Sequence, residues 1–125
     1  MTELEVIRIM RKHLEGLFPK VCFHCERSYA TLREYLLLTR PLGAAMPYDA
    51  EVGDWSPLRP MGTMTFSNCA CGTTLALSSQ GMSLLVLWRL LNWARVETAR
   101  RSMTPRELLG YLRDEISAQV LAETP

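Results

Sequence analysis

The chain has 125 residues, of which 48% are hydrophobic and 22% are charged. This length gives one domain with a single modest core, and this composition excludes a generally disordered protein. The formal net charge of +1 excludes a long-range field that attracts polyanions, so nucleic-acid binding would depend on a local basic patch.

The first predicted element is an amphipathic helix over residues 3–15, within an N-terminal segment of residues 1–18. Thr2 and Glu5 form a capping box, and the apolar residues after them recur with the helical period. The same segment mixes acids and bases, unlike a signal peptide, so we expect a cytoplasmic protein. No apolar stretch is long enough to span a bilayer, so we expect no membrane partner.

A pair of cysteines, Cys22 and Cys25, follows this helix with Cys-x-x-Cys spacing. A second helix is expected within residues 27–40, where Tyr29 and the leucines after it recur at helical spacing. Four prolines and three glycines then interrupt residues 40–62, and they predict a long irregular loop. Loops of this length are usually functional, mobile or held by another part of the protein.

Two short segments of strand-forming residues, 63–67 and 73–77, flank the sequence Asn-Cys-Ala-Cys-Gly. They predict a β-hairpin that carries Cys69 and Cys71 at its tip. Gly72 is suited to the positive φ that such a tip often needs, because glycine has no Cβ.

Two helices are predicted after the hairpin. The first runs over residues 79–102 as a long central helix, and its stripe of leucines with Trp88 is expected in the core. Trp93 is five positions further on and points about 140° away from Trp88, so it is expected at the surface. The second helix starts at Thr104, an N-cap followed by proline and then, at the third helical position, by glutamate.

The four cysteines are the strongest chemical signal in the sequence, because two pairs in tight turns can place four thiolates around one tetrahedral metal ion. Cys-Phe-His-Cys at 22–25 and Asn-Cys-Ala-Cys-Gly at 68–72 resemble the knuckles of zinc-ribbon and treble-clef domains. The second pair differs in its Cys-x-Cys spacing, and no glycine follows the first pair. The resemblance implies one structural Zn²⁺ per chain with four ligands, Cys22, Cys25, Cys69 and Cys71.

Other interpretations of the cysteines remain open: a reversible dithiol switch with or without zinc, an iron–sulfur cluster, or buried thiols without a metal. Iron–sulfur clusters usually recruit three closely grouped cysteines, which this chain lacks. A thioredoxin-like catalytic pair would need a βαβ pattern around Cys22 and Cys25, and the sequence does not have one.

Residues beside the cysteines are candidates for supporting the site. His24 lies inside the first turn, where it is expected to donate to a thiolate or to be solvated. Lys20 and Arg27 flank the same turn, as surface cations or as partners that offset the charge of about −2 of Zn²⁺ with four thiolates. Gly72 is the expected turn residue of the second pair.

The predicted fold class is α+β, a small helical domain in which a zinc-bound β-hairpin, similar to a zinc ribbon, is inserted between N-terminal and C-terminal helices. Residues 1–125 are expected to form a single domain. Its three parts are the N-terminal helix at 1–18, the four-cysteine module at 19–78 and the helical pair at 79–125.

Four sulfur ligands leave no open position for water, and the common catalytic motifs are missing, so we do not expect an enzyme. The favoured hypothesis is a bacterial-type regulatory or adaptor protein that binds a protein partner, or a second copy of itself, through its C-terminal helices. The alternatives are a thiol/zinc redox sensor and a nucleic-acid-binding zinc protein. The expected contact residues on the long helix are Trp93, Arg89, Arg95, Arg100 and Arg101.

Overall fold

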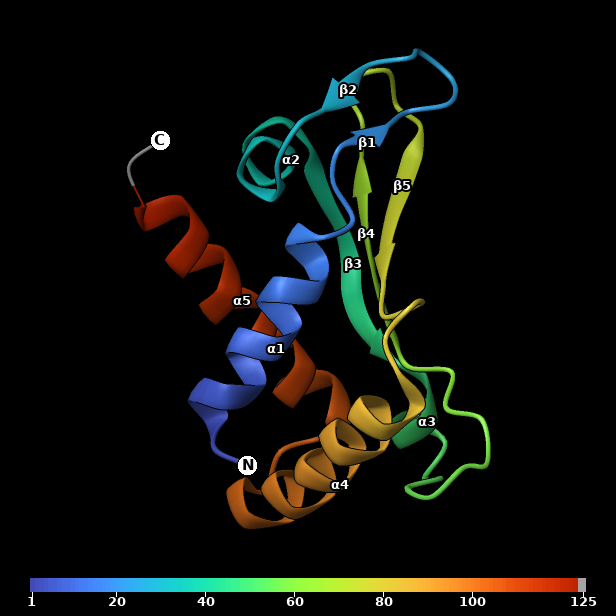
Figure 1. Ribbon diagram of the computed structural model, residues 1–125, viewed down its shortest axis with the longest axis vertical. Coiled ribbons are helices and arrows are strands. Elements are labelled where there is room, and N and C mark those ends of the chain that lie inside the picture. The colour runs from blue at the N-terminus through green and yellow to red at the C-terminus, as the bar shows by residue number, and fades with distance from the viewer. Residues whose placement is uncertain (124–125) are drawn as a thin grey trace.

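Five helices and two small antiparallel sheets form the fold in the computed structural model, which describes residues 1–123 (Figure 1). The predicted α+β class is confirmed, with the hairpin between the N-terminal and C-terminal helices. In chain order the elements are α1 (Glu3–Glu15), β1 (Lys20–Val21), β2 (Ser28–Tyr29), α2 (Leu32–Leu38), β3 (Arg40–Pro47), α3 (Tyr48–Glu51), β4 (Thr63–Asn68), β5 (Thr74–Ser78), α4 (Leu84–Arg101) and α5 (Pro105–Ala122).

The larger sheet has the strand order β3-β4-β5, and both strand pairs are antiparallel. Strands β4 and β5 form the predicted hairpin, and its last ladder pair places Asn68 opposite Thr74. The Thr74 hydroxyl donates to Asn68 Oδ1 over 2.8 Å, which ties the two strands together at this point. The tip that carries Cys69 and Cys71 therefore projects from a fully paired ladder.

The prediction of an irregular loop over residues 40–62 is wrong for its first part, which forms β3 and α3. Strand β3 lies at the edge of the sheet, where Pro41 and Pro47 are tolerated because one side of the strand has no ladder partner. The ladder shifts register in the middle of β3, where Gly43 has a φ of 69°. The residues that predicted a loop are therefore features of a bulged edge strand.

The irregular segment that remains, residues 52–62, is closed by the buried carboxylate of Asp49. Its two oxygens accept hydrogen bonds from the backbone N–H of Met61 at 3.0 Å and of Gly62 at 2.8 Å. Gly62 has a φ of 80°, and a Cβ at this position would lie 1.8 Å from Ser79 Oγ. The loop thus ends at a position that glycine alone fills without displacing Ser79.

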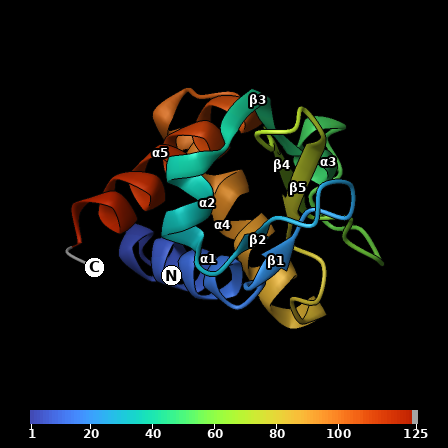
Figure 2. The ribbon, with the colours of Figure 1, turned by 90° about the horizontal axis from the view of Figure 1, so that it is seen from above.

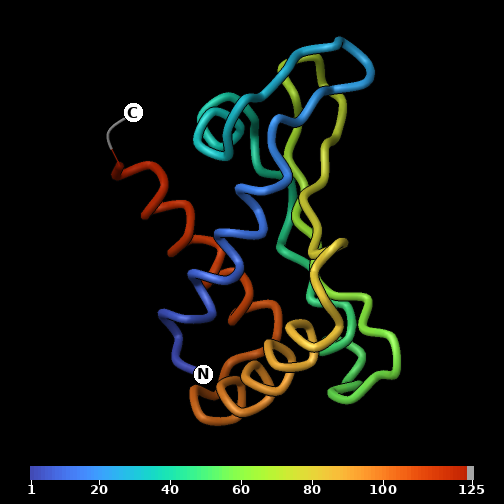
Figure 3. The backbone as a smooth tube through the Cα atoms, viewed as in Figure 1, coloured from blue at the N-terminus to red at the C-terminus, as the bar shows by residue number. Residues whose placement is uncertain are grey.

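Helices α1, α2 and α5 lie on one side of the three-stranded sheet, and α4 lies across the end of the molecule opposite the cysteine turns (Figure 1, Figure 2). The chain then returns through α5 toward α2 (Figure 3). There, the Arg33 guanidinium donates to the backbone carbonyls of Val120, Leu121 and Glu123, which satisfies the free carbonyls at the end of α5. Within residues 1–123, no helix combines the length and apolar character needed to cross a membrane.

The long helix begins later than predicted, at Leu84 rather than near residue 79. Gly81 has a φ of 94°, which is incompatible with a continuous helix, and the Ser83 hydroxyl accepts a hydrogen bond from the N–H of Val86 as the N-cap. Residues 79–82, before this cap, belong instead to the turn that joins the hairpin to α4.

The assignment of the two helix tryptophans to core and surface is also corrected. Trp93 is 8% exposed and belongs to the core, whereas Trp88 is 41% exposed. The Trp88 indole N–H instead donates to the Pro57 carbonyl at 2.8 Å and holds the 52–62 loop. The sequence pattern could not distinguish the two faces, because apolar residues cover more than half of the circumference at the start of this helix.

Candidate metal centre

The first cysteine pair lies in a tight turn between β1 and β2. The N–H of Cys22 donates to the Arg27 carbonyl at 2.9 Å, and the N–H of Glu26 donates back to the Cys22 carbonyl at 2.7 Å. Glu26 has a φ of 64°, a left-handed conformation that glycine adopts more easily. The turn therefore forms although no glycine follows Cys25, because Glu26 adopts the left-handed conformation instead.

The second pair lies at the tip of the β4–β5 hairpin. The N–H of Cys69 donates to the Thr73 carbonyl, and the N–H of Gly72 donates to the Cys69 carbonyl, both at 2.8 Å. Gly72 has the predicted positive φ, 92°, with nothing near the position of a Cβ. This turn brings Cys69 and Cys71 to the same side, although only one residue separates them.

The structure brings all four cysteine sulfurs together, within 4.8 Å of one another. Cys22 Sγ lies 3.8 Å from Cys71 Sγ, and Cys25 Sγ lies 3.6 Å from Cys69 Sγ. A tetrahedral Zn²⁺ ion with Zn–S bonds of about 2.3 Å needs sulfurs about 3.8 Å apart. The two turns, side by side in Figure 1 and Figure 3, can therefore hold a metal ion without large movement.

Tyr29 supplies a hydrogen bond to the site that the sequence did not reveal. Its hydroxyl donates to Cys69 Sγ over 2.9 Å, from a side chain with no exposed surface. This hydrogen bond, with a second from the backbone N–H of Cys71, lowers the pKa of Cys69 to about 6. Burial, and then the same contact with Cys69, raises the pKa of Tyr29 to about 12. The tyrosine thus remains a donor and stabilises the thiolate, the form that binds metal.

Tyr29 was not predicted as part of the site, because its aromatic ring fitted the helical spacing of the apolar residues after it. It lies instead in β2, where it pairs with Lys20 of β1 before α2 begins at Leu32. The signal in the sequence is its position four residues after Cys25, which places it beside the first turn.

Thr73 is a second neighbour of the sulfurs. Its hydroxyl lies 3.2 Å from Cys71 Sγ and, with the Thr73 backbone N–H, lowers the pKa of that thiol. The two pairs also share one pattern of burial, because Cys22 and Cys69 are buried while Cys25 and Cys71 are exposed. One side of the cluster therefore packs against the core, and the other faces solvent.

The predicted supporting residues of the first turn lie at the surface. His24 and Arg27 are exposed, and Lys20 is half-buried in β1. The Arg27 guanidinium lies 5.7 Å from the centre of the Tyr29 ring, and its charge opposes the rise in the Tyr29 pKa. Of these three side chains, Arg27 is the one that the structure places against a residue in contact with sulfur.

The arginines of α4 are largely engaged with neighbouring side chains. Arg101 pairs with Glu3 and Glu97, each at 2.7 Å, and its guanidinium lies 5.8 Å from the centre of the buried Trp93 ring. Arg100 pairs with the same Glu97 at 2.6 Å. These contacts fix the end of α4 to the start of α1.

The remaining two arginines predicted for a contact surface are exposed on α4. Arg95 donates to Asn92 Oδ1 within its own helix at 3.0 Å, and Arg89 follows the half-exposed Trp88 in the chain. The five predicted contact residues therefore do not form one continuous surface, since Trp93 lies in the core beneath them.

Four thiolates form a complete tetrahedral ligand set for a soft or borderline metal ion, and structural zinc sites use this set. Comparison of the chain with known proteins gives no matching family model, no matching curated protein and no matching solved structure. The interpretation of the site therefore depends on its own geometry.

Proposed function

We propose that this protein is a non-catalytic zinc-binding protein in which one Zn²⁺ is held by Cys22, Cys25, Cys69 and Cys71. The observation that carries this proposal is the approach of four sulfurs to within 4.8 Å, with two separations close to the value for tetrahedral zinc. Hard metal ions such as Mg²⁺ and Ca²⁺ prefer oxygen ligands, so four thiolates favour zinc.

The role of the metal is structural. Cys25 and Cys69 are 44 positions apart, and the two-residue strands of the first turn add few contacts of their own. A metal ion that joins the two turns fixes the end of the β4–β5 hairpin against the segment that leads into α2. Structural zinc binding contributes on the order of 10 kcal/mol of apparent free energy, which becomes folding free energy when the site forms with the fold.

The proposed biological role is that of a regulatory or adaptor protein that presents a surface to a protein partner. Support comes from the half-exposed Trp88 on α4 and from Leu84 and Leu85, one turn before it, which are 48% and 66% exposed. Aromatic and arginine side chains are favoured in protein interfaces, and Arg89, the next residue in the chain after Trp88, is also exposed. A second copy of the chain is the first partner to test.

Native mass spectrometry of freshly purified protein tests both parts of the proposal, because it reports bound metal and subunit number together. We expect one zinc ion per chain, and loss of zinc and of cooperative unfolding in Cys71→Ser. The matched control is Ala70→Ser, an exposed neighbour in the same turn. Retention of zinc by Cys71→Ser would contradict the ligand assignment, and a strictly monomeric protein would contradict the homodimer.

A thiol/zinc redox sensor is the second candidate, favoured by the exposure of Cys25 and Cys71 at the solvent side of the cluster. In this role hydrogen peroxide takes two electrons from two thiolates, which join as a disulfide. The peroxide takes up two protons and becomes two water molecules, and the zinc ion leaves. A zinc-sensitive dye should report metal release after mild peroxide and its rebinding after added thiol; an unresponsive site would exclude this role.

A further inference from the structure

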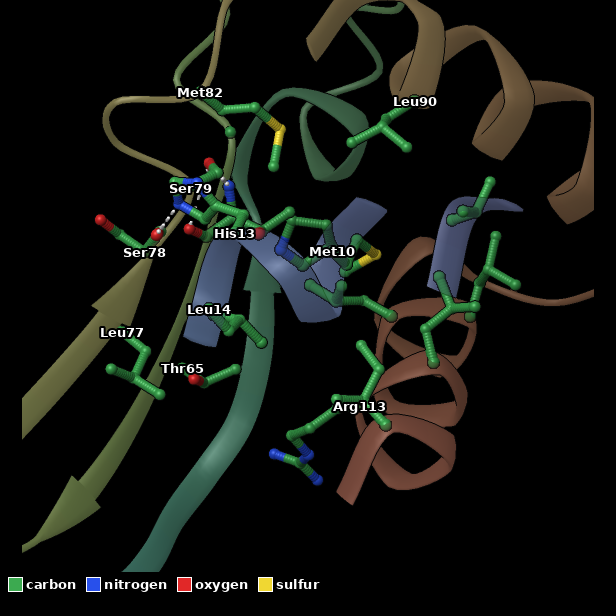
Figure 4. A pocket seen from close by; sticks show the side chains of 18 of the residues that line it. Met10, His13, Leu14, Thr65, Leu77, Ser78, Ser79, Met82, Leu90 and Arg113 are labelled. Carbon is green, nitrogen blue, oxygen red and sulfur yellow. Dashed lines mark hydrogen bonds between the residues drawn. The ribbon is translucent and has the colours of Figure 1, made fainter. Parts of the chain in front are cut away.

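A cavity of about 370 Å³ lies between the sheet and the helices, away from the cysteine cluster (Figure 4). Helices α1, α2, α4 and α5 contribute side chains to its wall, as do all three strands of the larger sheet. An engineered cavity of about 150 Å³ holds one benzene molecule, so this space has room for roughly a dozen non-hydrogen atoms. Ligand sites usually have volumes in the range of about 300 to 1,000 Å³.

The wall of the cavity is largely aliphatic. Met10 and Leu14 of α1 face Leu77 of β5, while Met82 and Leu90 lie at the α4 end (Figure 4). Trp93, the buried tryptophan of α4, also lines the cavity. Such a wall binds an apolar body through the hydrophobic effect, without a directional requirement.

Most polar groups around the α3–β5 side of the cavity already have partners in the protein. The ring Nε2 of His13 donates to the Ser78 carbonyl at 2.9 Å. The Asp49 carboxylate is used by the loop, and Ser79 Oγ accepts from the N–H of Thr63 at 2.9 Å. This side of the cavity therefore offers an apolar surface to a ligand.

The α2–α5 side has a buried polar group without a partner. Tyr35 lines the cavity and is 2% exposed, and its hydroxyl forms no hydrogen bond within residues 1–123. Burial raises the pKa of Tyr35. The Ser67 side chain partly opposes this rise from a position that does not meet hydrogen-bond geometry with the Tyr35 hydroxyl, which stays protonated at neutral pH. Buried hydroxyls nearly always have a partner, since an unsatisfied one costs about 1 to 3 kcal/mol. The Tyr35 hydroxyl is therefore available to donate to an acceptor inside the cavity.

The same side carries a positive charge. Arg113 of α5 lines the cavity and extends toward β3, at the opposite end from Met82 and Leu90 (Figure 4). Asp114 also lines the cavity, but its ion pair with Arg113 is long, 3.6 Å, and the Asp114 side chain is 76% exposed, so this pair is weak. A guanidinium is well suited to bind a carboxylate.

We propose that the cavity binds a medium-chain carboxylate, with its head between Tyr35 and Arg113 and its apolar chain directed toward Met82 and Leu90. The apolar wall accounts for the chain, the unpartnered hydroxyl for an acceptor, and the guanidinium for a negative charge. Decanoate has twelve non-hydrogen atoms, which is about the number that the cavity volume accommodates.

Titration of the full-length, zinc-loaded protein with decanoate and with decanol tests this proposal. The variant Trp55→Phe with Trp88→Phe leaves Trp93 as the sole tryptophan, and its fluorescence should change saturably with one decanoate per chain. Ala94→Leu, which fills the cavity from α4, should abolish binding of both compounds, whereas Ala99→Leu on the exposed side of the same helix should not. No saturable binding, or binding that Ala94→Leu leaves unchanged, would overturn the proposal.

Two further variants test the position of the head group. Arg113→Gln should weaken decanoate binding about tenfold and leave decanol binding unchanged, and the exposed Arg89→Gln should affect neither. Tyr35→Phe should not lower the melting temperature of the ligand-free protein, but decanoate should raise it less than in the parent protein. Equal loss of decanoate and decanol in Arg113→Gln would contradict the placement of the carboxylate.

Discussion

The hydroxyl of Tyr29 donates a hydrogen bond to Cys69 Sγ over 2.9 Å, and both side chains are almost completely buried. This contact joins the β2 segment to the hairpin tip independently of a metal ion. It also orients the Cys69 sulfur without a metal ion, because the tyrosine ring is itself held against Tyr35 with a centroid distance of 5.8 Å. Donors of this kind strengthen metal sites by fixing their ligands.

Tyr29→Phe should weaken zinc binding about tenfold without preventing it, because all four thiolates remain while Cys69 loses one of its hydrogen-bond donors. Competition with a chelator of known zinc affinity measures the change. Tyr48→Phe is the matched control, since the Tyr48 hydroxyl lies away from the cysteines and donates to the Met64 sulfur at 4.0 Å. An unchanged zinc affinity in Tyr29→Phe would mean that the hydrogen bond does not support the site.

Asp49→Asn should lower the free energy of unfolding by about 1 to 3 kcal/mol, because the amide group can accept at only one of its two ends. It leaves either the part-buried N–H of Met61 or the buried N–H of Gly62 without an acceptor. Urea unfolding measures this loss. Asp54→Asn changes an exposed acid in the same loop and should have little effect. Equal stability of the two variants would show that Asp49 does not hold the loop.

Gly62→Ala should destabilise the protein more than Gly53→Ala. Both glycines have a φ near +80°, so both substitutions carry the conformational penalty of the left-handed region. At Gly62, however, the new Cβ would lie 1.8 Å from Ser79 Oγ, whereas at Gly53 nothing lies within 4 Å. The difference in melting temperature between the variants isolates the clash, and no difference would mean that Ser79 moves freely.

The substitution Glu97→Gln should lower the stability of the folded protein at neutral pH. In acid the variant and the parent protein should be equally stable. Hydrogen bonds from Arg100, then Arg101, lower the pKa of Glu97 below its ordinary value. A carboxyl with a lowered pKa in the folded protein stabilises it above the unfolded pKa, and this contribution disappears as the pH falls through the folded pKa. Thermal unfolding of both proteins between pH 7 and about pH 2 should show the melting curves converge, with the exposed Glu115→Gln as a control.

The sequence predicted the elements that carry local signals. Thr2 and Thr104 mark the starts of α1 and α5, and their side chains accept the expected hydrogen bonds from Glu5 and Glu107. The hairpin followed from strand-forming residues on both sides of a five-residue tip. In each case a pattern of residues close together in the chain determines the element, so one sequence is sufficient to predict it.

The features that were missed depend on contacts between distant residues. Strand β3 contains residues typical of loops, and its pairing with β4 is not visible in its own sequence. The burial of Trp93 rather than Trp88 is decided by how α4 packs on its neighbours, since apolar residues on several sides leave its orientation open. The cysteine turns could be predicted individually, but their approach to one another comes from the whole fold.

The order of the cysteine pairs along the chain has a consequence for proteolysis. The exposed loop at 52–62 lies between the two pairs in sequence, so a metal ion bound by both pairs would turn the intervening chain into a closed ring. A protease that cuts this loop once opens the ring but leaves the two fragments attached through the ion and the β3–β4 ladder. The nicked protein would then migrate as one species in its native state and come apart when a chelator and a denaturant are applied together.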